Sequence, residues 1–203
     1  MAPKRRPQRP ARQERRTVLL VTNGKQTERT YLDQLKRRVA TSIAVTTKFI
    51  NGAPLTVTKE LQGPRSDTSS FDEVWIVVDH DGTDRSDFLA VCRRMSTRKT
   101  AVHGVVSVPC FEVWLNAHYG PIRNYQDQAD AQRHYRDLVQ APPGGDKGIP
   151  PEFPWDKMSE AAHQCYLTHA GLPAIDTQGP CPSTTMPHLL AGLGLLTLPV
   201  PPA

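Results

Sequence analysis

The chain has 203 residues, 38% of them hydrophobic, which is enough for one domain with a core, or for one domain with a small appendage. It contains no run of about 18 apolar residues, so a membrane span is excluded. No apolar stretch of signal-peptide length follows the basic N-terminus, so secretion is not expected. The four cysteines form no CxxC pair, which argues against a zinc knuckle and favours a cytoplasmic protein with free thiols.

The net charge of +5 comes from the N-terminal arm. Residues 1–16 hold seven basic residues and one acid, whereas the rest of the chain holds 18 basic and 19 acidic residues. Such an arm binds phosphate backbones without sequence preference. Its composition fits equally well a disordered extension that keeps the protein in solution. Both interpretations stay open on the sequence.

Up to about residue 120, apolar runs alternate with segments of helical periodicity. The runs predict strands at 17–22, 43–50, 73–79 and 101–107. Helices are expected at 28–39, with Thr27 as N-cap, at 84–95, and after Pro109, with a short helix or loop near 54–61. This alternation predicts right-handed βαβ units and a mostly parallel sheet flanked by helices.

The remainder of the chain predicts a different organisation. Helices are expected near 126–140, 157–170 and 186–195, and they are separated by Pro- and Gly-rich segments. The predicted division is therefore a disordered basic arm, an α/β domain and a mainly helical, Pro-rich C-terminal extension. These three parts are 1–16, 17–120 and 121–203.

The run Asp79-His80-Asp81-Gly82-Thr83 follows the most apolar of these strands. Ligands of open α/β sheets bind at the carboxyl ends of the strands, so the position favours a site. Two carboxylates at this spacing leave the strand on the same side and repel each other, and a divalent cation relieves that repulsion. Mg²⁺ binds one or two protein carboxylates and retains water ligands for a phosphate substrate. The other interpretation is an ordinary acidic turn, in which Asp and Gly are common.

Glu28 stands at the start of the first predicted helix, and so near the same edge of the sheet. It faces Asp79 and Asp81 if the first and third strands are neighbours, or it merely complements the helix dipole. Lys25 is a candidate phosphate contact or a solvated surface residue. Glu112 is a further acid of the site or a surface residue. His118, Trp75 and Trp114 are expected in the core.

Four blocks in this order resemble the RloB-like family. They are the run Asn23-Gly24-Lys25-Gln26-Thr27-Glu28 with Tyr31, the segment 71–83, the segment 107–119, and Pro182-Ser183-Thr184. RloB-like proteins are prokaryotic proteins found near restriction–modification and abortive-infection genes, and their core is similar to the topoisomerase–primase (TOPRIM) fold. That fold pairs a Glu after the first strand with a DxD after a later one to bind Mg²⁺ for phosphodiester chemistry.

The resemblance implies an Mg²⁺- or Mn²⁺-dependent nuclease that acts on DNA or RNA in anti-phage defence, with a nearby-encoded defence ATPase as a further partner. It assigns metal binding and catalysis to Glu28, Asp79 and Asp81, makes Glu112 a site acid, and makes Lys147 a phosphate contact. One departure is that TOPRIM proteins place a glutamate directly before the glycine, where this chain has Asn23. An amide binds a phosphate oxygen but does not exchange a proton, so either Glu28 supplies the carboxylate or the domain only binds.

Two other classes remain. Asp79-x-Asp81-Gly82-Thr83 also resembles the first motif of haloacid-dehalogenase-type phosphatases, in which the first Asp is the nucleophile and Lys147 would bind phosphate. That motif normally ends the first strand, whereas here a strand and a helix precede it. The third interpretation is a non-catalytic nucleic-acid-binding or regulatory protein that uses the basic arm and a degenerate site.

Overall fold

Five strands form one sheet in the computed structural model, which describes residues 15–64, 66–140, 148–166 and 171–198. The strands are β1 (Arg16–Thr22), β2 (Ile43–Phe49), β3 (Glu73–Asp79), β4 (Ala101–Val108) and β5 (Ser183–Thr184). Their order is β2-β1-β3-β4-β5, and the first four are parallel, while β5 runs antiparallel to β4. The expected α/β class with a mostly parallel sheet is therefore confirmed.

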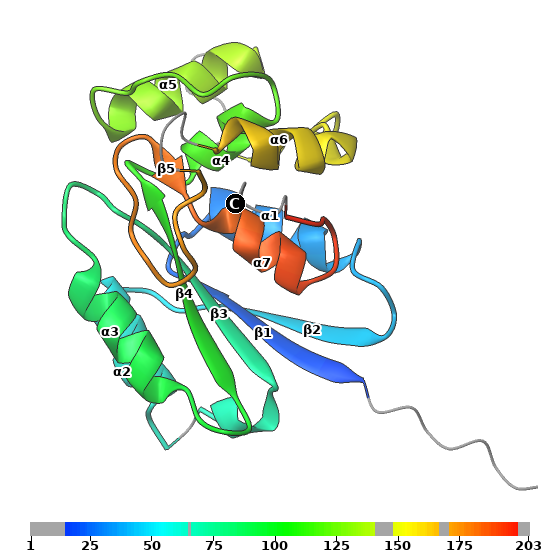
Figure 1. Cartoon of the computed structure of the whole chain (residues 1–203), viewed down its shortest axis with the longest axis vertical. Coiled ribbons are helices and arrows are strands. Elements are labelled where there is room, and N and C mark those ends of the chain that lie inside the picture. Colours follow the sequence, from blue (N-terminus) through cyan, green and yellow to red (C-terminus); the bar gives the residue numbers. More distant parts are fainter. Residues whose placement is uncertain (1–14, 65, 141–147, 167–170, 199–203) are drawn as a thin grey trace, which may run out of the picture.

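Helices cover both faces of this sheet (Figure 1). On one face lie α2 (Pro54–Leu61) and α3 (Ser86–Met95), and on the other lie α1 (Thr27–Lys36) and α7 (Met186–Gly192). Three more helices extend this second layer beyond the sheet: α4 (Glu112–Ala117), α5 (Gln128–Leu138) and α6 (Met158–Gln164). Short 3₁₀ turns occur at Thr68–Ser70 and Trp155–Lys157.

Each face of the sheet has its own apolar core, because alternate residues of a strand point to opposite faces. Leu20 and Val77 pack with side chains of α1, α4 and α7 on one face. Val21 and Ile76 pack with α2 and α3 on the other. The central strands are buried on both sides, which explains their continuous apolar sequence.

The four predicted strands are confirmed to within a residue at each end, but several helix boundaries differ. Gln26, and not Thr27, is the N-cap of α1, and the helix ends at Lys36, where the next two amides bond to carbonyls only three residues back. The helix expected from Pro109 begins at Glu112, because the Pro109 carbonyl accepts a hydrogen bond from the Asp81 amide.

Further differences lie at the two ends of the chain. β5 was not predicted, since two residues carry no periodicity; it pairs with Val108 and Ser107 of β4. α6 ends at Gln164, and part of the helix expected at 157–170 lies outside the described residues. Most of the basic arm, residues 1–14, also lies outside them, but Arg16 begins β1 and forms an ion pair with Glu73. Within the described chain, no helix is long and apolar enough to cross a membrane.

Candidate functional site

The carboxyl ends of β1 and β3 meet at one edge of the sheet. The two strands are parallel neighbours, and Thr22 at the end of β1 lies beside Val77, two residues before Asp79. The turn that carries Glu28 therefore opens next to the loop that carries Asp79 and Asp81. The adjacency on which the predicted metal set depended is present.

The acidic loop after β3 is fixed by the backbone of the last residues of β4 and of Pro109. The amide of His80 donates to the Ser107 carbonyl over 2.9 Å, and the amide of Asp81 donates to the Pro109 carbonyl over 3.1 Å. Asp81 and Gly82 then both adopt positive φ, at 49° and 69°. Asp tolerates this left-handed conformation better than most residues and Gly adopts it freely, which is the physical reason for the Asp-Gly pair at this turn.

Asp79 is the electrostatic centre of the edge. Its Oδ1 is buried and has no hydrogen-bond partner. Burial raises the pKa of Asp79 well above its usual range, and the negative charges of Glu28, Glu112 and Asp81 raise it further, in that order. A hydrogen bond from the Phe111 amide opposes this shift only in part. The structure therefore brings together all four carboxylates that the sequence pointed to.

Glu28 reaches this edge by folding over the glycine of the preceding turn. A Cβ built on Gly24 would lie 2.0 Å from Cδ of Glu28 and 2.2 Å from its Oε2. Contacts this short do not occur between real side chains, so the Glu28 carboxylate occupies the space that any larger residue at position 24 would fill. The Gly24 amide is itself held by the Thr22 hydroxyl at 2.9 Å.

The sequence left two alternatives for Glu112, a further acid of the site or a surface residue, and the structure excludes the surface residue. Glu112 is only 6% exposed, at the start of α4, with Cys110 just before it in the chain. Burial raises the pKa of the Cys110 thiol, and the charges of Glu112 and Asp79 raise it further. Both causes favour the neutral thiol in the metal-free protein.

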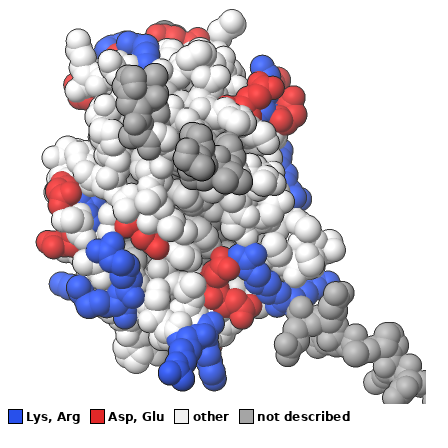
Figure 2. Space-filling view, viewed as in Figure 1, with Lys and Arg blue, Asp and Glu red and all other residues white. Residues whose placement is uncertain are grey.

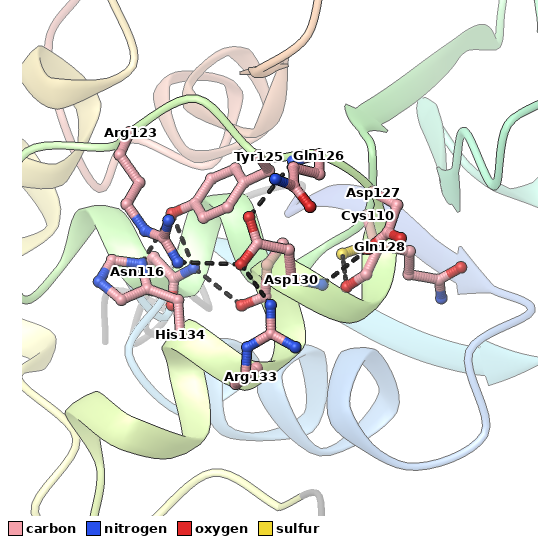
Figure 3. A network of polar contacts seen from close by, with 11 residues as sticks. Cys110, Asn116, Arg123, Tyr125, Gln126, Asp127, Gln128, Asp130, Arg133 and His134 are labelled. Carbon is pink, nitrogen blue, oxygen red and sulfur yellow. Dashed lines mark hydrogen bonds and ion pairs between the residues drawn. The ribbon is translucent and has the colours of Figure 1, made fainter.

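A polar network fixes the segment behind Glu112 (Figure 3). The side-chain amide of Asn116 donates to the Tyr125 hydroxyl at 2.9 Å and to the Ala131 carbonyl at 3.2 Å. The Tyr125 hydroxyl in turn lies 3.0 Å from Nδ1 of His134. These bonds fasten α5 to α4 and thereby hold the residues that flank Glu112.

Asp130 anchors the other half of this network. It is 6% exposed and accepts from the guanidinium groups of Arg123 and Arg133 at 3.0 and 2.8 Å, and from the Gln126 amide at 3.2 Å. The carboxylate of Asp127 caps α5 by accepting from the Asp130 amide. These contacts identify Asp130 as a structural acid, distinct from the four at the sheet edge.

Arg85 is a residue of the site that the sequence did not reveal. Its Nε donates to the carbonyl oxygen of Asp79 at 2.8 Å, and its Nη2 lies 3.9 Å from Oδ2 of Asp81. Its own amide donates to the Gln178 side chain at 2.9 Å, which ties the loop to the segment before β5. The only signal in the sequence is a single arginine four residues after Asp81, which is too common to mark a site.

The other predicted residues are less central. The Asn23 amide nitrogen donates to the Gly52 carbonyl at 3.1 Å, so it joins the turn after β1 to the turn after β2. Lys25 is exposed on the first of these turns. Lys147 lies outside the described residues. His118, Trp75 and Trp114 are 2%, 3% and 0% exposed, which confirms them as core residues.

The donor set suits a hard cation. As the side chains stand, no three His, Cys, Asp or Glu residues in the described ranges are arranged to enclose a metal ion. The orphaned, buried Oδ1 of Asp79, however, has three carboxylates as neighbours and no donor to neutralise it. Carboxylate oxygens are ligands for Mg²⁺ and Mn²⁺, and a cation reduces the repulsion that holds such groups apart.

Comparison with known proteins gives one match. No curated protein and no solved structure matches the chain. A family model described as RloB-like protein matches residues 18–193, which runs from β1 to the end of α7 and includes all four carboxylates. The chain therefore belongs to the RloB-like family.

Proposed function

We propose that this protein is a metal-dependent nuclease that cleaves phosphodiester bonds at the carboxyl edge of its sheet. Membership of the RloB-like family points to a restriction-locus-associated or defence-related role. The observation that carries the nuclease proposal is the buried, unpartnered oxygen of Asp79 among the carboxylates of Glu28, Asp81 and Glu112. Such a cluster is unfavourable without a cation, so its presence at a sheet edge supports a metal site.

Glu28, Asp79 and Asp81 are the residues that would hold Mg²⁺ or Mn²⁺. The cation would act there as a Lewis acid on the oxygens of a phosphodiester. Asp79 provides a ligand from the rigid end of β3, whereas Asp81, with a side chain 45% exposed, provides one from the solvent side. Glu28 lies in the first turn of α1, at the positive end of the helix dipole, a position that suits a metal ligand or a general base.

Arg85 and Glu112 support this arrangement from either side. Arg85 holds the main chain of Asp79 and keeps a positive charge near Asp81. Glu112 is buried, and its negative charge acts on Asp79 from the start of α4. The site thus combines acids that would hold a cation with the positive charge of Arg85, and electrostatic stabilisation of this kind is the main form of catalysis in phosphoryl transfer.

The test uses the purified full-length chain with labelled single- and double-stranded DNA and RNA. We expect cleavage with Mg²⁺ or Mn²⁺, none in EDTA, and none in Asp79→Asn or Asp81→Asn. A calorimetric titration with Mn²⁺ supplies a readout that is independent of activity: wild type binds, and Asp79→Asn does not. Absence of Mn²⁺ binding in the wild type refutes the metal site.

The phosphatase interpretation has its own outcome in the same experiments. The aspartate nucleophile of those phosphatases normally ends the first strand of its domain, whereas Asp79 ends β3, after β1, α1, β2 and α2. We therefore expect no hydrolysis of phosphomonoesters and no trapping of beryllofluoride on Asp79. Positive results in both assays would replace the nuclease proposal with the phosphatase.

A further inference from the structure

A cleft beside the carboxylates, between α1 and β2, has the composition of a nucleic-acid contact. Its lining includes Arg29 and Asp33 of α1 and Thr47, Lys48 and Phe49 of β2. The guanidinium of Arg29 lies 5.9 Å from the centre of the Phe49 ring. Asp33, the one acid of the lining, accepts a hydrogen bond from the Thr47 hydroxyl and is thus engaged within the protein.

The register of the sheet places this cleft on the same face as the candidate site. Thr22 of β1 lies between Phe49 on β2 and Val77 on β3. Because Asp79 follows Val77 by two residues, Asp79 and Phe49 project to the same face. Neighbouring strands are about 4.8 Å apart and each strand residue adds about 3.3 Å, so the two positions are separated by roughly 12 Å.

Basic residues lie between the carboxylate cluster and the cleft. Glu28 of the carboxylate cluster is followed directly by Arg29 on α1, and Lys25 stands exposed on the turn before them. The edge therefore presents cations beside acids, so an anionic polymer is attracted next to the metal ligands and not onto them. Arg29 lies over the Phe49 ring, and a cation beside an aromatic ring is a pattern that proteins use to bind the backbone and a base of a single strand.

We propose that a single strand of nucleic acid enters the site along this cleft, with phosphates on Lys25 and Arg29 and a base or sugar on Phe49. This inference rests on the proposed nuclease function and adds the substrate path to it. The strand leaves the cleft at Glu28, where it meets the carboxylates.

The test measures the affinity of the full-length chain for fluorescein-labelled poly(dT) and poly(U) in EDTA over a range of salt concentrations. Removing one cation that neutralises a phosphate of a single strand flattens the slope of log affinity against log salt by about 0.7. The Lys25→Gln/Arg29→Gln variant should thus flatten it by about 1.4. Phe49→Leu should weaken binding about tenfold with the slope unchanged, and Phe49→Tyr should restore it.

The matched control removes one arginine and one lysine elsewhere. Lys and Arg side chains also gather over α3, which covers the other face of the sheet (Figure 2). Arg94 in the last turn of α3 and Lys99 in the turn before β4 are exposed there. Arg94→Gln/Lys99→Gln changes the net charge equally and leaves the basic arm in place, and it should leave the slope as in the wild type.

If both double variants flatten the slope of log affinity against log salt equally, only overall charge matters and the proposed path is wrong. An unchanged slope in Lys25→Gln/Arg29→Gln would overturn the path as well. Because binding is measured in EDTA, its outcome is separate from catalysis. Strand binding that depends on Arg29 and Phe49 without any Mn²⁺-dependent cleavage supports the path and refutes the nuclease. Cleavage by a Lys25→Gln/Arg29→Gln variant that keeps the wild-type slope and rate refutes the path and supports the nuclease.

Discussion

Gly24 and Glu28 share one space: a Cβ on Gly24 would stand 2.0 Å from the carboxyl carbon of Glu28. The glycine is thus the reason that a glutamate one helical turn away lies over the turn after β1. Asn23, the residue directly before this glycine, carries no carboxylate, so Glu28 is the acid of this turn. The proposed metal set depends on this apposition, so we expect position 24 to control the activity through Glu28.

Gly24→Ala should lower nuclease activity to the level of Glu28→Gln while changing the free energy of unfolding by less than about 1 kcal/mol. The displaced group is the end of a flexible side chain, so the fold accommodates the methyl group while the carboxylate moves. Activity assays and urea unfolding measure the two effects. Gly148→Ala, where a Cβ meets nothing within 4 Å, is the matched control and should be silent in both.

Glu28→Gln should abolish cleavage and preserve stability to within about 1 kcal/mol, because the interaction with the helix dipole that it removes is small. Asn23→Ala should weaken activity less, through loss of the bond from its amide to the Gly52 carbonyl. Steady-state kinetics of the two variants decides between the positions. Activity that survives Glu28→Gln but disappears in Asn23→Ala would assign the key role to Asn23.

Asp79→Asn should stabilise the metal-free protein, since it removes a buried carboxylate that three other acids repel. A gain of about 1 kcal/mol corresponds to roughly 2–4 °C in Tm for a chain of this size. Mn²⁺ should raise the Tm of the wild type and leave that of Asp79→Asn unchanged, because binding to the folded state alone stabilises it. A metal-free Asp79→Asn variant that melts below the wild type would contradict the proposed repulsion.

Arg85→Gln should loosen the acidic loop, since it removes a charged donor from the Asp79 carbonyl. We expect a loss of roughly 1.5–3 kcal/mol in unfolding free energy, together with weaker Mn²⁺ binding. Arg85→Lys retains the charge near Asp81 and should recover part of the Mn²⁺ affinity. Calorimetric titration of the three proteins tests this, and unchanged Mn²⁺ affinity in Arg85→Gln would exclude a positioning role.

His118 should make the protein less stable in mild acid. Burial lowers the pKa of His118 from 6.5 to about 4, so the folded state keeps the ring neutral. Between these two values the unfolded chain binds a proton that the folded chain does not, and stability falls as the pH falls. The full effect is about 3 kcal/mol. His118→Phe should flatten the pH dependence of urea unfolding between pH 6.5 and 4, and an unchanged slope would assign the loss to other groups.

The sequence alone determined the α/β class, the four long strands and the acidic motif after β3. These features are local: a strand buried on both faces is a continuous apolar run, and the strand–helix alternation dictates a parallel sheet whose carboxyl ends meet. The resemblance to the RloB-like family also followed from the sequence, through four blocks of residues, and the family match confirms it.

Only the tertiary structure decided which long-range neighbours these local elements acquire. β5 forms because Ser183 and Thr184 pair with the edge of β4, and no pattern in two residues predicts that pairing. Glu112 is buried because α5, fastened through Asn116, covers its helix. Arg85 reaches the Asp79 carbonyl through the shape of one turn. Burial and hydrogen bonding depend on what packs against a residue, and a single sequence does not record those contacts.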